Sequence, residues 1–224
     1  MADCKNCLRS GLFLSVDSNG LCASCSPIVI MDVQQKGRLV SDCMKLIEES
    51  QNLDVQLTRY DFLMENLRAL LNYEQKGIPT ISPLSSFLFK EYQGKKDALV
   101  VKHLTAAFDA AIEKTPITTS AKTKVNRLSK VLIKLRDHKE KLVDRTAVDQ
   151  LERRIVDAIH KVQLEGYLEA AQKAEFKGQK KKALDQYYEA LYFLKHDEID
   201  DALQSEYISQ VESKIKELGH TDEK

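Results

Sequence analysis

Four of the five cysteines lie within the first 25 residues and form two Cys-x-x-Cys pairs, Cys4 with Cys7 and Cys22 with Cys25. Each pair places two thiolates on one tight turn, and two such turns supply the four sulfur ligands that tetrahedral zinc prefers. Four protein ligands leave no open coordination position. We therefore expect a structural Zn²⁺ ion near the start of the chain rather than a catalytic one.

Two other uses of the four cysteines remain open. A disulfide framework is typical of small secreted domains, whereas this chain of 224 residues is long enough to bury a core without such staples. An iron or redox centre would use the same soft thiolates. The fifth cysteine, Cys43, is predicted to be a core thiol because it shares an apolar helical face with Leu39, Val40, Leu46 and Ile47.

The segment between the two cysteine pairs has the pattern of a β-hairpin. Leu12, Leu14 and Val16 alternate with Phe13 and Ser15, which is typical of a strand, and Asp17-Ser18-Asn19-Gly20 favours a turn. Each cysteine pair would then lie near one end of the hairpin. Folding of the hairpin would assemble the site, and metal binding would supply much of the folding free energy.

Residues 1–30 resemble the zinc-ribbon and treble-clef group of modules, in which paired cysteine turns flank a β-hairpin. In treble clefs the second pair opens a helix, and here Cys25-Ser26-Pro27 leads into a long helical pattern. Many such turns carry glycine after the second cysteine, whereas this chain has Leu8 and Ser26. The resemblance implies a small module stabilised by its metal.

The remainder of the chain is predicted to be helical. From residue 33 onward apolar residues recur at spacings of three and four, and 8 Gly and 4 Pro are too few for a loop-rich protein. The predicted fold is mainly an all-α helical bundle of hairpins with a small N-terminal zinc ribbon that contains one β-hairpin. Helices are expected over 28–51, 54–75, 95–114, 121–143, 147–176 and 200–218, the first two as an antiparallel pair.

We divide the chain into a module at 1–30, a helical hairpin at 31–78, a linker or loop at 79–94 and a helical domain at 95–224. Two prolines among Ser and Thr residues mark the start of the linker, and Pro116 ends the helix after it. Heptad spacing in 121–176 favours coiled-coil packing. A weak capping signal at Thr146 and Asp149 predicts two helices there, although one continuous rod remains open.

The apolar spacing also predicts which side chains face inward. The predicted inward positions are Val101, Leu104, Phe108 and Ile112 in the helix at 95–114, and Leu203, Tyr207, Val211 and Ile215 in the helix at 200–218.

Residues 164–195 resemble a single tetratricopeptide helical hairpin. A helix with small residues on one face runs into Gly178, and Ala183, Tyr187 and Ala190 then follow at spacings of four and three. The resemblance implies a repeat-like binding hairpin, with these three residues as candidates for contacting a partner. Plain packing of three helices, with 200–218 as the third, is the alternative.

Charge is balanced overall but not locally. Lys+Arg 34 equals Asp+Glu 34, so no global field attracts nucleic acid or an anionic membrane. Residues 120–145 carry nine basic residues against three acidic ones, and 197–224 carry nine acidic against three basic. Arg127, Lys130 and Lys134 are candidates for partner binding. Three interpretations of this basic face stay open: it is exposed to solvent, it contacts a protein or the acidic C-terminal helix, or it binds nucleic acid.

Recognisable catalytic motifs are not found in the sequence. The five histidines have no ligand or triad spacing, and the acidic pairs at 197–198 and 200–201 favour helix capping. Without an apolar run that could span a bilayer, we expect a cytoplasmic protein with no membrane partner. The predicted function is that of a non-enzymatic zinc-binding adaptor or scaffold that binds a protein partner or self-associates. The alternatives are a nucleic-acid-binding protein that uses the zinc ribbon and 120–145, and a redox protein that uses the four cysteines.

Overall fold

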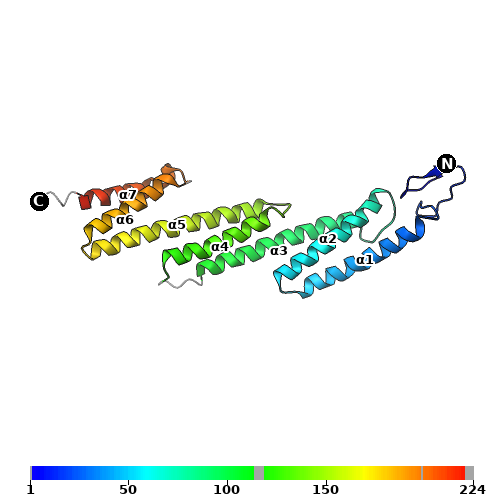
Figure 1. The fold of residues 1–224 in the computed structure, drawn as a ribbon, viewed down its shortest axis with the longest axis horizontal. Coiled ribbons are helices and arrows are strands. Elements are labelled where there is room, and N and C mark those ends of the chain that lie inside the picture. Colours follow the sequence, from blue (N-terminus) through cyan, green and yellow to red (C-terminus); the bar gives the residue numbers. More distant parts are fainter. Residues whose placement is uncertain (1, 114–118, 198, 220–224) are drawn as a thin grey trace. The chain divides into compact units, whose positions relative to one another are not determined.

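The computed structural model describes residues 2–113, 119–197 and 199–219, and within these the chain forms seven helices and one two-stranded sheet (Figure 1). The predicted fold class is confirmed. The elements are β1 Ala2–Asp3, β2 Ser10–Gly11, α1 Ser26–Glu49, α2 Leu53–Gln75, α3 Ser85–Glu113, α4 Ala121–Lys139, α5 Thr146–Phe176, α6 Lys180–His196 and α7 Asp201–Gly219. None of the described helices is both long and apolar enough to cross a membrane.

The described chain divides into two compact units. The first contains the residues up to His103 together with Leu142–Asp144, and the second contains Leu104–Lys141 and the residues from Arg145 onward. The boundary falls inside α3, so this helix contributes residues to both units. The N-terminal module belongs entirely to the first unit.

The β-hairpin of the module encloses the first cysteine pair. β1 and β2 pair antiparallel, with Ala2 opposite Gly11 and Asp3 opposite Ser10. The strand predicted for residues 12–16 is wrong, because the chain turns after Gly11 and this stretch makes only a single bridge, between Val16 and Cys22. The predicted turn at residues 17–20 is present.

Helices α1 and α2 form the predicted antiparallel pair (Figure 1). α1 begins directly after Cys25, with Pro27 in its first turn, where the missing N–H of proline costs nothing. α2 begins after Asn52, whose side chain accepts a hydrogen bond of 3.1 Å from the backbone N–H of Val55. The buried core of the pair includes Cys43, as predicted, whereas Leu46 is exposed and was wrongly placed inward.

The loop predicted at 79–94 is shorter than expected, because α3 already begins at Ser85. A carboxylate from the preceding helix caps it: Glu74 accepts hydrogen bonds from the backbone N–H groups of Ser85 (2.6 Å) and Ser86 (3.2 Å). When the first N–H groups of a helix bond to a side chain from another helix, no capping residue is needed next to them, so the local sequence carries no capping signal. Ile112 on α3 is exposed rather than inward, and the helix end predicted at Pro116 lies outside the described residues.

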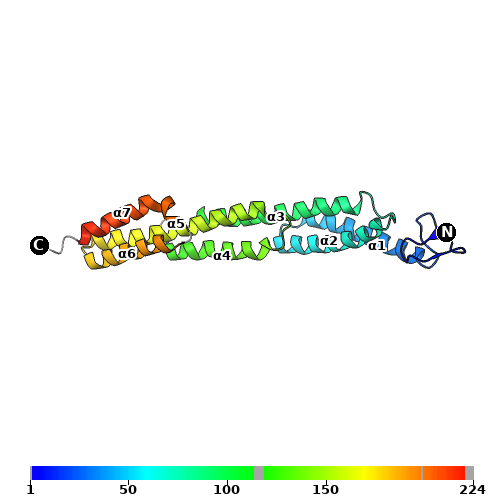
Figure 2. The same cartoon turned by 90° about the horizontal axis from the view of Figure 1, so that it is seen from above.

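Residues 121–176 form two helices and not one rod. α4 and α5 lie side by side in both views, and residues 140–145 separate them (Figures 1 and 2). The capping signal at Thr146 is not used as predicted, because Arg145 is the N-cap residue and makes no side-chain cap hydrogen bond. A Cβ added at Gly166 of α5 would lie 2.6 Å from the Cβ of Ala121, so the two helices approach each other closely here.

The last three helices form a packed series in which α6 contacts both α5 and α7. Gly178 ends α5 with a φ of +69°, as its predicted role as a helix stop requires. The predicted inward stripe of α7 is partly wrong, since Leu203 and Tyr207 are exposed. Gln204 is buried instead, because its amide donates to the backbone oxygen of Leu194 at 3.3 Å and to Asp197 Oδ1 at 3.0 Å.

Candidate metal centre

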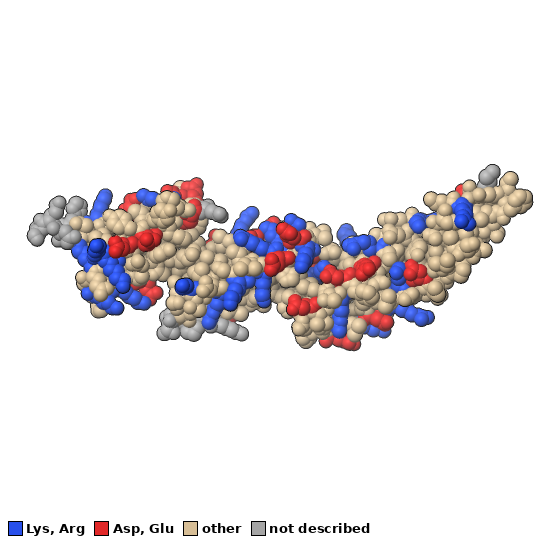
Figure 3. Space-filling model, in the orientation of Figure 1, with Lys and Arg blue, Asp and Glu red and all other residues tan. Residues whose placement is uncertain are grey.

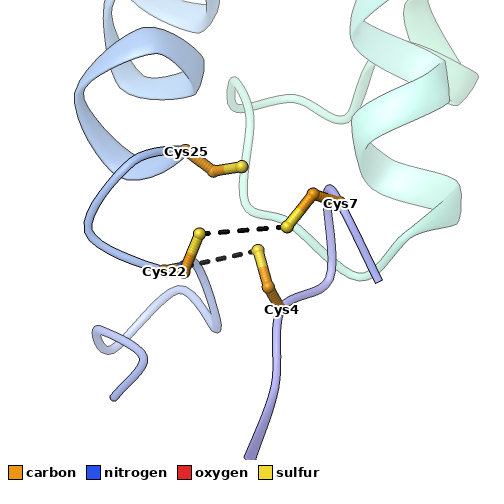
Figure 4. Close-up of side chains that lie close together, drawn as sticks. All are labelled: Cys4, Cys7, Cys22 and Cys25. Carbon is orange, nitrogen blue, oxygen red and sulfur yellow. Dashed lines mark hydrogen bonds between the residues drawn. The ribbon is translucent and has the colours of Figure 1, made fainter. Parts of the chain in front are cut away.

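The four N-terminal cysteines converge on one point, with their sulfur atoms all within 4.8 Å of one another (Figure 4). The Sγ atoms of Cys7 and Cys22 are 3.9 Å apart. Zinc–sulfur bonds of about 2.3 Å in a tetrahedron require sulfurs about 3.8 Å apart, so this spacing fits a bound ion. Among the described residues, these cysteines form the one group of three or more potential ligands that converges in this way.

The first cysteine turn is closed by backbone hydrogen bonds. The N–H of Leu8 donates to the carbonyl of Cys4 at 2.8 Å, and the N–H of Cys4 donates to the carbonyl of Arg9 at 2.9 Å. To complete this turn Leu8 adopts a φ of +60°, in the left-handed region that favours glycine. Leu8 therefore occupies a left-handed position after the second cysteine of the pair, where turns of the zinc-ribbon kind, which this segment resembles, often carry glycine.

The second cysteine turn leads directly into α1. The N–H groups of Cys25 and Ser26 both donate to the carbonyl of Cys22 at 2.9 Å, and the second of these bonds begins the helix. This confirms that the second pair opens a helix. The N–H of Cys22 also donates to the sulfur of Cys4 at 3.3 Å and so links the two turns.

Asn6 was not among the residues predicted for the site, and its side-chain amide nitrogen lies 3.7 Å from the sulfur of Cys25. Its place between Cys4 and Cys7 gave no signal of this contact, which depends on how the two turns face each other. An amide donor next to a sulfur stabilises the thiolate form that a metal requires.

The protonation of the cluster shows how strongly the sulfurs interact. Backbone N–H groups of Cys7 and Cys22 lower the pKa of Cys4 to about 6. The Asn6 amide lowers the pKa of Cys25, but desolvation and the neighbouring sulfurs outweigh it and raise that pKa to about 11. Four thiolates this close repel one another unless a cation lies among them, so the chemistry of the cluster favours a bound metal ion.

The disulfide alternative does not match the geometry. All five cysteines are free, and the 3.9 Å between the sulfurs of Cys7 and Cys22 is nearly twice the ~2 Å of a disulfide bond. Cys43 is buried among the helices of the first unit and is not a member of the cluster.

The turn between the cysteine pairs is held by the carboxylate of Asp17. Its Oδ1 accepts hydrogen bonds from the N–H groups of Asn19 (2.8 Å) and Leu21 (2.9 Å). Its Oδ2 accepts a hydrogen bond of 2.5 Å from the hydroxyl of Ser26. The Ser26 hydroxyl and these backbone groups lower the pKa of Asp17, because all of them donate to its charged form.

The module shares its core with the end of the α1–α2 pair. Cys4, Leu21 and Cys22 are buried together with Val29 of α1 and Ile78 beyond α2. The chain turns toward the module at Gly77, where the N–H of Ile78 donates to the carbonyl of Tyr73 at 3.0 Å. The candidate metal site is therefore attached to the first unit through Cys4 and Cys22, which are buried in its core.

Two side-chain hydrogen bonds join the first cysteine turn to the same region. The ammonium of Lys5 donates to the carbonyl of Gly77 at 2.6 Å, and that of Lys76 donates to Asn6 Oδ1 at 3.1 Å. The turn that carries two of the four candidate ligands is thus held against the end of α2.

The other candidate residues lie in the second unit and do not form one site. Ala183, Tyr187 and Ala190 are buried in the packing of α6, so their side chains hold helices together and are not available to a partner in this conformation. Arg127 and Lys134 are exposed on α4, as is Lys130 between them.

The basic segment makes ion pairs with α5, whereas a contact with the acidic C-terminal helix was one of the alternatives that the sequence left open. Arg136 and Lys139 of α4 pair with Glu152 of α5, at 2.8 and 2.7 Å, and Lys139 also pairs with Asp149 at 2.6 Å. Basic α4 is therefore partly neutralised by its neighbour α5.

The acidic pairs near α7 only partly follow the capping prediction. Asp200 caps the start of α7 by accepting from the N–H of Ala202 at 2.9 Å, as predicted. Asp197 accepts from the N–H of Ile199 at 2.9 Å and also lies 2.5 Å from Nε2 of His160, a contact that the sequence did not indicate. Residue 198 lies outside the described residues.

Comparison with known proteins found no relative for this chain: no family model, no curated protein and no solved structure matches it. Only the geometry of the cysteine cluster and the surfaces around it therefore indicate a function.

Proposed function

We propose that this chain is a non-enzymatic interaction protein whose N-terminal module is stabilised by a structural Zn²⁺ ion bound by Cys4, Cys7, Cys22 and Cys25. The observation that carries the proposal is the convergence of these four sulfurs within 4.8 Å of one another. Four thiolates complete a tetrahedral shell, so no position is left on the ion for a substrate or an activated water.

The place of the cluster in the fold supports a structural role for the metal. The cysteine turns share a buried core with Val29 and Ile78, so the ion would hold the module against the α1–α2 pair. A module fixed in this way presents the same surface each time, which favours docking to another protein because less ordering is needed on binding.

The first experiment measures the metal content of the purified full-length chain by mass spectrometry. We expect one zinc ion per chain, and loss of that zinc in Cys7→Ala. Cys43→Ala is the matched control, since it removes a thiol outside the cluster and should keep the zinc. A wild-type chain without zinc, or a Cys7→Ala variant that retains it, would contradict the proposal, and a bound iron would favour the redox alternative.

The second experiment tests the docking role by affinity capture followed by crosslinking. Partners of the module should be captured by the wild type and by Cys43→Ala and should be lost with Cys7→Ala. Capture that is identical for all three proteins would show that the metal module takes no part in binding.

The nucleic-acid alternative is favoured by one observation on the second unit. Arg127, Lys130 and Lys134 are all exposed and follow one another at spacings of three and four, which places them on one face of α4. Binding through three phosphate contacts would give a slope of about −3 in a plot of log affinity against log salt concentration. A slope near zero, or binding unchanged by Lys130→Glu with Lys134→Glu, would remove this alternative.

A further inference from the structure

The metal module differs from the rest of the chain in its charge. Residues 8–31 contain only two charged residues, Arg9 and Asp17, although charged residues make up 30% of the sequence. On the face drawn in Figure 3, the part of the first unit that carries the N-terminus is correspondingly mostly tan. A folded surface with so few charges is unusual unless something covers it.

The same segment exposes large apolar side chains. Phe13 is fully exposed, and the exposed fractions of the others are 79% for Leu8, 81% for Leu12, 64% for Ile28 and 65% for Met31. We call these five residues the module surface. Leu12 and Phe13 are adjacent in the chain, and Ile28 and Met31 lie three residues apart on α1, which places these two on one side of the helix. A compact module of this length is only about 20 Å across, which is no wider than a standard protein interface.

The cysteine cluster fixes the two halves of the module surface relative to each other. Leu8 directly follows Cys7, and Ile28 lies one helical turn after Cys25. Because the sulfurs of both turns lie within 4.8 Å of one another, a bound ion would hold Leu8 and Ile28 on one rigid scaffold. Rigid apolar surfaces bind with a smaller entropy loss than mobile ones.

The size of the module surface matches one side of a stable interface. Burial of a large apolar side chain removes about 100 Å² from water, so the five together offer roughly 500 Å² of apolar area. Interfaces are about 57% apolar, and a standard one covers about 800 Å² on each partner. The module surface is therefore large enough to form the apolar part of such an interface.

The charge of the chain indicates what fits there. Nucleic acid and anionic lipid need several basic side chains, whereas Arg9 is the one basic residue in the segment 8–31 that carries the module surface, and the ammonium of Lys5 donates to the carbonyl of Gly77. An uncharged apolar surface fits another of the same kind. The formal net charge of the chain is zero, so two copies do not repel each other.

We propose that the module surface binds the module surface of a second copy, so that the protein is a twofold-symmetric dimer joined at its metal modules. In a twofold interface the same residues contribute from both copies. This inference rests on the proposed metal site, because only a folded module presents Leu8 and Ile28 together.

The test is sedimentation velocity of the zinc-loaded full-length chain over a wide range of concentration. The wild type should show a monomer–dimer equilibrium. Leu12→Ser combined with Phe13→Ser should raise the dimer dissociation constant by at least about a hundredfold, because each substitution acts twice in a twofold interface. Both side chains are exposed, so the variant should keep its zinc and its helix content.

The matched control combines Phe176→Ser with Leu203→Ser, which removes an exposed phenylalanine and an exposed leucine from the second unit. It should leave the dissociation constant unchanged. A zinc-loaded wild type that stays monomeric at all concentrations would overturn the inference, as would a dimer that the Leu12 and Phe13 substitutions leave intact. Cosedimentation of a zinc-loaded monomer with neutral phosphatidylcholine vesicles would overturn it in favour of a membrane surface.

The metal content of the same samples separates the two proposals. A monomer that contains one zinc ion contradicts the dimer and leaves the metal site supported. A chain without zinc contradicts the proposed function itself, whatever its state of association.

Discussion

Leu8→Gly is expected to tighten zinc binding, although it removes a large apolar side chain from the module. Leu8 has a φ of +60°, and its side chain is exposed, so it gains little from packing. A residue with a Cβ in the left-handed region is strained because the Cβ approaches the following carbonyl oxygen. Glycine has no Cβ and adopts this conformation without that strain.

The magnitude follows from two opposing terms. The left-handed conformation costs about 1–2 kcal/mol for a residue other than glycine. Glycine in turn loses more conformational freedom on folding, which costs about 0.5–1 kcal/mol. The difference favours the folded module by about 0.5–1 kcal/mol, and because metal binding and folding of such a module are coupled, zinc affinity should rise about two- to fivefold.

The assay is competition for zinc between the full-length chain and a chromophoric chelator at low protein concentration. Leu12→Gly is the matched control, because it removes a similarly exposed leucine of the module that has no positive φ. It should leave zinc affinity unchanged or weaken it. Equal or weaker zinc binding by Leu8→Gly would refute the reasoning, since the strain at the first cysteine turn would then contribute nothing to affinity.

Three further predictions concern the helices. Gly166→Ala should destabilise the second unit by about 1 kcal/mol, because the new Cβ would lie 2.6 Å from the Cβ of Ala121 and this clash outweighs the better helix propensity of alanine. Gly94→Ala is the control, since a Cβ there meets nothing within 4 Å, and it should stabilise its unit by about 0.5–1 kcal/mol. Thermal unfolding measures both changes. Glu152→Gln should cost up to about 1 kcal/mol at neutral pH. Lys139 and Arg136 donate to the Glu152 carboxylate and hold its pKa below the ordinary 4.5. This stabilisation is therefore present above pH 4.5 and is lost as the pH falls through the native pKa, so urea titrations of the two proteins should converge in acid. Removal of zinc by a chelator should increase hydrogen exchange at the start of α1 and the end of α2 and leave α5–α7 unchanged, and uniform loss of protection would argue against a local role for the metal.

The helical part of the fold could be predicted from spacing because each helix carries its own period. The antiparallel pair α1–α2 followed from apolar residues three and four apart. The break between α4 and α5 did not: it was predicted from a capping signal at Thr146 that the structure does not use, because Arg145 is the N-cap residue of α5. The start of α3 could not be predicted, because its first N–H groups are satisfied by Glu74 from another helix and the local sequence shows only Pro and Ser. The face of α7 was misjudged for a similar reason: Gln204 is buried through hydrogen bonds to distant atoms, and a polar residue is never chosen for an inward stripe.

The candidate ligands were predictable because their chemistry and their spacing both lie in the chain. Two Cys-x-x-Cys pairs specify a tetrahedral sulfur site wherever they meet. The strands around them could not be located, since alternation at residues 12–16 suggested a strand where the structure has a turn and exposes Leu12 and Phe13. Apolar and polar residues alternate both in a half-buried strand and in a loop with exposed apolar residues, and only the tertiary fold distinguishes the two.

The turn found at residues 12–16, where a strand was predicted, explains why the module surface is exposed. If residues 12–16 formed a strand as the alternation suggests, Leu12 would cover part of the module's own small core. The pairing of β1 with β2 ends the hairpin at Gly11 instead, and the turn that follows points Leu12 and Phe13 into solvent. A module of about 30 residues cannot bury them itself, because its small core already consists of Cys4, Leu21 and Cys22 together with Val29 and Ile78. A bound ion would relieve the module of the need for a larger core, so its apolar side chains are free to act between molecules.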